Sequence, residues 1–419
     1  MIAFIKSLWS DRRGNAMVLA AAALPLVLGS AGLASDTIEW ALWKRQLQRA
    51  ADSAALAGVY AKVESQSYTS AVTADLARNN HVGITTVVTP SNPPSSGAYT
   101  SDAMAVRVSL AVQKRLSFSS IFLATAPTIR ATATATIVPS GQYCVVSLEN
   151  TAVTGINATG STDVNLGCGM ITNSTSLNAA VATGSAEVIA SPIAAVGGIP
   201  ASNNWGPGTV LQPFTIAQDD PFAAVVPPTG QSCSGNTNVP NNSTATIGAA
   251  NTVTCVGSLS LAGTATLRGT IYVDGGGVTV GTQANVTCDQ CTIVLTNHST
   301  SPTATIGNFE VTGSPQMHWV APTSGTFKGL LIYQDRRAID GTSNNLQNKL
   351  RGSSTSYFEG AFYFPGQQLE FAGTTGMNTN CLQLVSRRVV FTGNSAINNT
   401  CPGGSGAMSF AGKRVRLVE

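Results

Sequence analysis

The sequence predicts a membrane-anchored α+β protein with one N-terminal transmembrane helix, a small α+β module and a long β-rich body. Three observations lead to this prediction. A stretch without charged residues extends from Gly14 to Ser35, and an alanine-rich helix pattern follows it. From about residue 141 onward, short Thr- and Val-rich runs alternate with Gly, Ser and Asn turns. Charged residues make up only 10% of the chain and apolar residues 43%, a balance that fits many short strands better than disorder.

The uncharged stretch at residues 14–35 has the length of a membrane span. Its apolar core of about 20 residues, at ~1.5 Å per residue, crosses a hydrocarbon layer of ~30 Å. A cleaved signal peptide is the alternative, because Gly32-Leu33-Ala34 offers small residues for cleavage, but such peptides have apolar regions of only ~7–15 residues. A buried helix of a soluble domain is disfavoured by the basic residues Lys6, Arg12 and Arg13 that precede the stretch. We therefore predict a retained transmembrane helix.

The charges that flank the span predict its orientation. Arg12 and Arg13 lie directly before it, whereas Asp36 and Glu39 follow it at once and the basic residues on that side begin only at Lys44. The positive-inside rule therefore favours a cytoplasmic N-terminus and an exported body.

Residues 36–63 predict a further helix, since this segment contains no proline and its apolar residues recur on one face. Most of that face is alanine, which permits close approach of a neighbouring helix or sheet. Packing on its own domain is the first interpretation and a self-association surface the second. Asp36 could cap this helix, although the span can also continue directly into it. The apolar face consists of Trp43, Leu47, Ala50, Ala54, Ala57 and Ala61.

Three features of this N-terminal region occur together. Arg12-Arg13-Gly14-Asn15 precedes the span, Asp36 follows it, and an alanine-rich motif lies in the helix. The motif consists of Leu47, Gln48, Ala50, Ala51, Asp52, Ala54, Ala55 and Leu56. Together they resemble the N-terminal (TadE/TadG-like) region of TadG-like proteins of the tight-adherence (Tad, or Flp) pilus system.

The resemblance implies a non-enzymatic component of pilus assembly in the bacterial inner membrane, single-pass, with a periplasmic body. Its implied partners are the inner membrane and other Tad/Flp assembly proteins. Two features depart from related patterns. Leu19 stands where pseudopilins of the system carry a glutamate five residues after the processed glycine, which argues against cleavage at Gly14. The chain also lacks an Asp-x-Ser-x-Ser motif, so no metal-dependent adhesion site is implied.

The chain after the span divides by sequence pattern into three parts. Helix candidates at 36–63 and 68–83 precede strand candidates at 103–112 and 129–138, which suggests an α+β module. In the β-rich part, two Gly-Ser starts at 160 and 184 lie about one solenoid coil apart, so we predict a parallel β-helix-like body, with a β-sandwich as the alternative. The predicted divisions are a cytoplasmic segment at 1–13, the span at 14–35, the module at 36–140, a β-rich segment with a Pro/Gly linker at 141–230, and a β-solenoid-like domain at 231–419.

The eight cysteines all follow the span, in the part predicted to be exported. An even count in an oxidising compartment favours disulfides. Eight cysteines allow 105 connectivities, and we predict pairing between sequence neighbours, because the coils of a solenoid keep them close. Strand-like flanks make the Cys288-Asp-Gln-Cys291 pair a structural bridge rather than a redox or zinc site. The predicted pairs are Cys144 with Cys168, Cys233 with Cys255, Cys288 with Cys291 and Cys381 with Cys401.

The sequence offers no assembled active site. The three histidines, at 81, 298 and 318, have no partner at metal spacing, and we expect neither cofactor nor metal. A polysaccharide-active enzyme on a β-helix is the rival function, with Asp219-Asp220, or Asp335 beside Arg336 and Arg337, as candidate acids. We expect these groups to form a linker and a local salt bridge instead. A surface adhesin is a third function class. A net charge of +3 without a basic stripe argues against nucleic acid.

Overall fold

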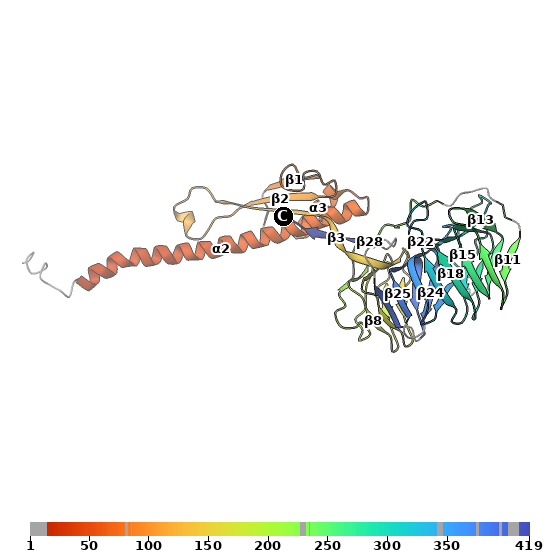
Figure 1. Cartoon of the computed structure of the whole chain (residues 1–419). Coiled ribbons are helices and arrows are strands. Elements are labelled where there is room, and N and C mark those ends of the chain that lie inside the picture. The colour runs from red at the N-terminus through yellow and green to blue at the C-terminus, as the bar shows by residue number, and fades with distance from the viewer. Residues whose placement is uncertain are drawn as a thin grey trace, which may run out of the picture. The chain divides into compact units, whose positions relative to one another are not determined.

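The computed structural model describes residues 15–79, 83–84, 86–226, 232–233, 235–341, 347–373, 377–393, 396–400 and 410–419. The chain forms two compact units (Figure 1). One comprises residues 1–138 together with 415–419, and the other comprises residues 139–414. The segments predicted separately as 141–230 and 231–419 thus share one unit, except for the last five residues.

The N-terminal unit is built along helix α2 (Asn15–Val63), a single helix of 49 residues. The span therefore continues directly into the stalk helix, and Asp36 lies inside the helix instead of capping a new one. Within the described chain, α2 is long and apolar enough to cross a membrane. Among the residues of α2 whose burial is described, none from Val18 to Ser35 is buried, and Asp36 is the first that is.

A short helix and a small antiparallel sheet complete this unit. Helix α3 (Tyr68–Arg78) starts where predicted and is capped by Ser67, whose Oγ accepts the Ser70 N–H at 3.3 Å. Strand β2 (Val106–Gln113) pairs antiparallel with β1 (Thr86–Ser91) and with the first part of β3 (Thr128–Ser147). The chain end returns to this sheet, where Thr134 N–H donates to the Glu419 carbonyl at 2.8 Å. Residues 415–419 thereby belong to the N-terminal unit, which the sequence did not indicate.

The C-terminal unit is strand-rich, and its larger part consists of three parallel ladders. Each strand pairs in register with the third strand after it, so that three successive strands form one layer of the stack. All three ladders reach β24 (Tyr357–Gly373). The first ladder contains β11 (Asn236–Val239), β14 (Ser258–Leu261), β17 (Val278–Val280), β20 (Phe309–Val311) and β23 (Asn348–Gly352); the second contains β12 (Thr244–Ile247), β15 (Thr264–Leu267), β18 (Asn285–Asp289) and β21 (Gln316–Val320); the third contains β13 (Val253–Val256), β16 (Thr270–Asp274), β19 (Thr292–Thr296) and β22 (Leu330–Gln334).

The first strands of this unit in sequence stack behind the last ones. Strand β24 pairs with β26 (Leu382–Phe391), and β26 pairs in parallel with the end of β3 and with β4 (Ile156–Ala158). From there the stack continues through β6 (Gly169–Thr172), β7 (Ala180–Ala182), β9 (Ile193–Ala195) and β10 (Leu211–Gln212). A smaller parallel sheet holds β25 (Met377–Asn380), β27 (Ala396–Thr400), β5 (Asp163–Asn165) and β8 (Glu187–Ile189). The order in space therefore starts at β11 and ends at β10.

Alternation of side chains explains why these Thr- and Ser-rich runs form strands. In β14 and β15, the residues Leu259, Leu261, Ala265 and Leu267 are buried, while the Ser and Thr residues between them are more exposed. The inward residues of all the ladders join in one core cluster, whose largest members include Trp319, Phe309 and Phe362.

A buried charge cluster joins the two parts of the stack. Glu149 is fully buried and accepts hydrogen bonds from Arg387 Nε at 3.0 Å and Arg388 Nη1 at 2.8 Å, both from β26. Thr151 donates to it through its N–H and its hydroxyl, and Arg388 also pairs with Asp340 at 2.6 Å. Burial alone would raise the pKa of Glu149, but the hydrogen bonds from Arg387, Thr151 and Arg388 lower it to about 2.

Removal of Glu149 should weaken the junction between β26 and the segment that begins at β3. We expect Glu149→Ala to lower the free energy of unfolding by about 3 kcal/mol, since it leaves Arg387 and Arg388 without their buried partner. The stabilisation should be complete above pH ~4.5 and should disappear as the pH falls toward 2, because the pKa is lower in the folded state than in the unfolded one. Denaturant titration of the full chain measures both effects.

The matched control is Glu310→Ala, which removes a more exposed ion pair with Lys349 at 3.5 Å. Such pairs contribute about 0–1 kcal/mol, so this variant should unfold nearly as the wild type does. Equal losses in the two variants would contradict the role given to Glu149.

Candidate functional site

The alanine-rich motif of α2 packs on the sheet of its own unit. Leu47, Ala50, Ala51, Ala54 and Ala55 are all buried, and they form one apolar cluster with side chains of β2 and β3. The partners on β2 are Val106, Val108, Leu110 and Val112, at every second position of the strand. Short alanine side chains let the helix lie close to the sheet. The buried face of the motif therefore packs within its own domain, which was the first interpretation of the alanine-rich face.

The polar residues of the motif hold the helix on the same sheet. The Gln48 side-chain amide donates to the carbonyl oxygen of Thr132 in β3 at 3.0 Å and to Asp52 Oδ1 at 2.8 Å. Asp52 therefore orients Gln48, and Gln48 bonds the sheet. The eighth motif residue, Leu56, is partly buried against the cluster.

A second set of contacts lies where the uncharged part of α2 ends. The loop between β2 and β3 contains the short 3-10 helix η1 (Ser119–Ile121), and its backbone is held by acidic residues of α2. Asp36 Oδ1 accepts the Phe118 N–H at 2.8 Å, and Asp36 Oδ2 accepts both the N–H and the hydroxyl of Ser119. One turn later, Glu39 accepts the N–H of Ser117 at 3.2 Å and its hydroxyl at 2.7 Å. We call residues 32–39 of α2 together with residues 114–123 the helix–loop junction.

The charge state of Asp36 follows from these bonds. Burial by itself would raise the pKa of Asp36, but the hydrogen bonds from the Ser119 hydroxyl and from the Phe118 and Ser119 N–H groups outweigh it and lower the pKa below its usual value. The carboxylate is thus ionised at neutral pH, and it accepts hydrogen bonds from two backbone N–H groups of the loop, those of Phe118 and Ser119.

A glycine of α2 provides the space for this loop. A Cβ atom built at Gly32 would lie 2.3 Å from the ring of Phe118, a separation that atoms do not tolerate. The ring of Phe118 in turn meets that of Phe122 edge to face, at a centroid separation of 5.4 Å. At Gly29, one turn earlier, a Cβ atom would meet nothing within 4 Å.

Gly32 and Gly29 therefore form a matched pair for testing the junction. We expect Gly32→Leu to displace Phe118 and to increase amide hydrogen exchange in residues 114–123 by about tenfold or more, since the loop loses its seat on α2. Gly29→Leu should leave exchange in this loop unchanged. Hydrogen exchange with mass spectrometry on the full chain in detergent measures both; equal protection in the two variants would show that the close approach at Gly32 does not hold the loop.

The structure contains disulfides between Cys144 and Cys168, Cys233 and Cys255, and Cys288 and Cys291. Each joins cysteines that are neighbours in sequence. Cys401 lies outside the described residues, so the pair proposed between Cys381 and Cys401 stays a prediction. Cys288 lies in β18 and Cys291 directly precedes β19, so this bridge closes the turn between two strands.

The carboxylates considered as catalytic candidates are all engaged by cations. Asp335 forms a turn with Arg337, whose Nη2 lies 2.7 Å from Asp335 Oδ2, and it also accepts the Thr296 hydroxyl at 2.9 Å. Burial would raise the pKa of Asp335, but the bonds from Arg337 and Thr296 lower it. Arg337 extends to the carbonyls of Asn297 and Ser301, so the pair holds a loop.

Asp219 and Asp220 lie in the linker after β10 and are bound separately. Asp220 Oδ2 accepts the Tyr363 hydroxyl at 2.7 Å and pairs with Arg336 at 3.3 Å, while Asp219 pairs with Lys413. Arg336 also donates to the carbonyls of Phe222 and Val225. These groups attach the linker to the ladder surface.

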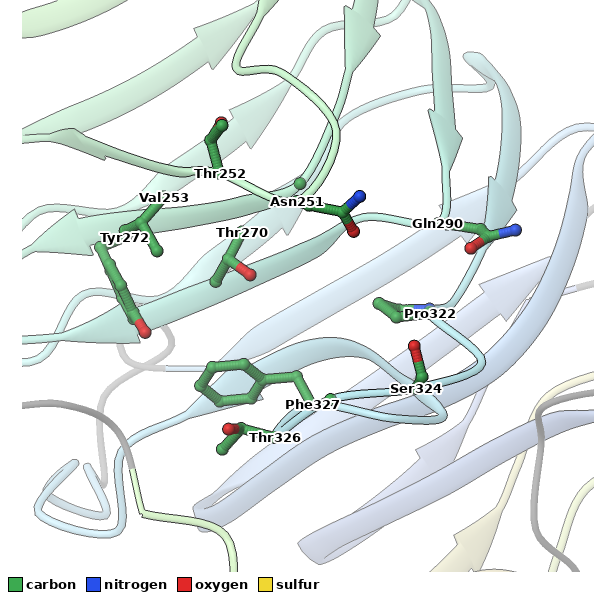
Figure 2. Close-up of a pocket in the computed structure, with 12 residues that line it drawn as sticks. Asn251, Thr252, Val253, Thr270, Tyr272, Gln290, Pro322, Ser324, Thr326 and Phe327 are labelled. Carbon is green, nitrogen blue, oxygen red and sulfur yellow. The ribbon is translucent and has the colours of Figure 1, made fainter.

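A hollow of about 290 Å³ opens beside β13 and β16. Figure 2 shows Asn251, Thr252 and Val253 on one side and the loop that carries Pro322, Ser324 and Phe327 on the other. None of its lining residues is acidic, basic or a histidine, and burial raises the pKa of Tyr272 to about 12. This hollow offers hydroxyl and amide groups, and it contains no group that transfers protons near neutral pH.

Neither of the two described histidines, His298 and His318, belongs to a group of candidate metal ligands. His298 pairs with Asp274 at 2.8 Å. Asp274 also accepts the N–H of Cys233, so it holds the linker shortly before β11. His318 stacks on Tyr357 at 4.6 Å between ring centroids. His81 lies outside the described residues. Across the described part of the chain, no three His, Cys, Asp or Glu side chains are grouped so that they could hold a metal ion.

These features define a chain with a long apolar N-terminal helix, a small module packed on that helix, and a large strand-rich body. Residues 14–62 match the family model described as putative Flp pilus-assembly TadE/G-like. The match covers the uncharged stretch, Asp36 and the complete motif from Leu47 to Leu56, and it confirms the resemblance to TadG-like proteins of the Tad pilus system. It indicates that the chain takes part in Flp/Tad pilus assembly. No curated protein and no solved structure matches the chain.

Proposed function

We propose that this chain is a non-enzymatic component of Flp/Tad pilus assembly, anchored in the inner membrane through residues 14–35 with its bulk in the periplasm. The observation that carries the proposal is the family match to α2, the helix that joins the candidate span to the buried motif without a break. The proposed span and the helix that packs on the module are one continuous helix, α2. Other Tad/Flp assembly proteins are the proposed partners.

A structural role for the body is supported by what its charged groups do. Glu149, Asp220, Asp274 and Asp335 each hold one segment of the C-terminal unit to another. The hollow beside β16 lacks an acid or a base. We further propose that the three in-register ladders wind as a parallel β-helix, which is the architecture that pairs each strand with the third one after it.

A surface adhesin is the second candidate, and one feature of the second ladder favours it. Thr244, Thr264, Asn285 and Gln316 stand opposite one another on successive strands, and all four are exposed. This polar row is an extended surface that has no role in the core. An adhesin would use such a row for contact with a surface or a sugar, while an assembly component would use it for another subunit.

Deletion of the gene tests the assembly role directly. We expect the deletion strain to lose surface pili in electron micrographs and to regain them when the full chain is supplied. Complementation with Asp219→Asn should also restore pili, because the pair of this candidate acid with Lys413 is exposed and contributes little to stability. Normal pili in the deletion strain would contradict the proposal, and failure of Asp219→Asn at normal protein levels would favour the enzymatic rival.

The orientation has its own test. Protease added to intact spheroplasts should degrade the C-terminal unit, since an exported body is accessible from outside, while the segment before residue 14 stays protected. Immunoblots with antibodies to each end measure this, and lysed spheroplasts serve as the control in which both ends are cut. A body that survives in intact spheroplasts would overturn the orientation.

A further inference from the structure

The loop between β2 and β3 exposes three consecutive apolar side chains. Ile121, Phe122 and Leu123 are 72%, 73% and 51% exposed. Outside α2, no other run of three large apolar residues is exposed in this way among the residues the structure describes. Exposed apolar residues that occur singly need no explanation, but a contiguous group at a loop tip marks an interaction surface.

The tip of this loop lies beside the end of the uncharged stretch of α2. Phe118 lies against Gly32, and the loop backbone is bonded to Asp36 and Glu39, so the tip stands beside the last turn of the uncharged stretch. Figure 1 shows the connection between β2 and β3 extending back along α2 toward the N-terminal half of the helix. The exposed tip therefore lies at the level where the proposed span leaves the bilayer.

The residues around the tip have the composition of a membrane interface. On α2, Leu28 and Leu33 are exposed on the side of the span, and Trp40 is exposed one to two turns beyond Asp36. At the base of the loop, Arg115 is exposed and Lys114 lies over the ring of Trp43 at 4.7 Å. Aromatic and basic side chains concentrate at this depth of a membrane, where rings meet the acyl boundary and cations meet phosphates.

We propose that residues 119–123 insert into the headgroup and acyl boundary of the membrane that α2 crosses, so that Ile121, Phe122 and Leu123 contact lipid. The inference rests on the proposed anchoring of α2. The N–H groups of the three apolar residues are already bonded within the loop: Ile121 donates to the Phe118 carbonyl at 3.1 Å, and Phe122 and Leu123 donate to the Ser119 carbonyl at 3.0 and 2.8 Å. These bonds lower the cost of bringing the backbone toward hydrocarbon. The occupant of this surface is a phospholipid bilayer, with Arg115 favouring anionic headgroups.

The insertion would give the N-terminal unit a defined orientation at the membrane. A single helix that crosses a bilayer is free to rotate about its own axis, and its tilt is set by neighbouring contacts. A loop fixed to one side of that helix and inserted into the same interface adds a second point of attachment. The module then presents a constant face to its assembly partners.

Fluorescence quenching in nanodiscs tests the proposal. The full chain carrying Phe122→Cys, labelled with an environment-sensitive dye without reduction of its disulfides, is placed at one copy per disc of phosphatidylcholine and phosphatidylglycerol. We expect its emission to shift to shorter wavelength and to be quenched by nitroxide-bearing lipids at least about twofold more than a label at Ser101→Cys. Ser101 is an exposed polar residue of the same unit. Ile121→Cys serves as a second position, since Phe122 also contacts Phe118.

A label at Leu26→Cys, on the exposed part of the proposed span, distinguishes the anchoring of α2 from the insertion of the loop. If the Leu26 label is quenched and those at positions 121 and 122 behave like the one at 101, the loop insertion is wrong and the anchoring stands. If the Leu26 label is not quenched either, the anchoring itself fails. If the emission of a loop label shifts to shorter wavelength but is not quenched by nitroxide-bearing lipids, the loop is covered by protein and not by lipid. That result would also overturn the proposal.

Discussion

The pairing of β26 with the end of β3 determines the organisation of the C-terminal unit. This parallel contact places residues 143–212 behind the last strands of the chain, so the first and last strands of the stack, β11 and β10, are close in sequence and distant in the ladder order. The described residues of the linker that joins them contact the stack at several points. Gln218 is bonded to Asn173, Asp220 to Tyr363, and Cys233 to Cys255. Phe222 also lies in a second apolar cluster together with Tyr333 and Tyr363.

This arrangement explains the use of charge in a chain that has few charged residues. A buried ion pair is costly to form and costly to break. In this unit the fully buried Glu149 is paired with Arg387 and Arg388 of β26, and the partly exposed Asp220 is paired with Arg336. Both contacts join segments that are distant in sequence. Within the ladders, backbone hydrogen bonds and apolar burial provide most of the contacts, and many exposed positions carry Thr, Ser and Asn.

The N-terminal unit solves a different problem, the connection of an apolar helix to a folded module. The same helix has no buried residue from 18 to 35 and is packed on a sheet from Leu47 onward. Asp36 and Glu39 lie at the transition, and they bond a loop that comes from 82 residues later in the chain. Alanine in the motif and glycine at position 32 serve the same purpose, since each lets another part of the unit approach the helix axis closely.

The amino-acid sequence by itself determined the local features. It predicted the apolar stretch, the helix after it, the strand-rich character of the body and the family of the N-terminal region. Helix periodicity, strand alternation and the alanine-rich motif all involve residues that are close together in the sequence, so they can be recognised without the tertiary structure. Strand candidates at 103–112 and 129–138 correspond to β2 and the first part of β3 for the same reason. Only the tertiary structure decided the stack order, the return of residues 415–419 to the N-terminal unit, and the docking of residues 117–119 on α2. These depend on pairing between distant segments, whose partners are selected by shape and hydrogen bonding after the local elements exist, and no spacing in the sequence encodes them.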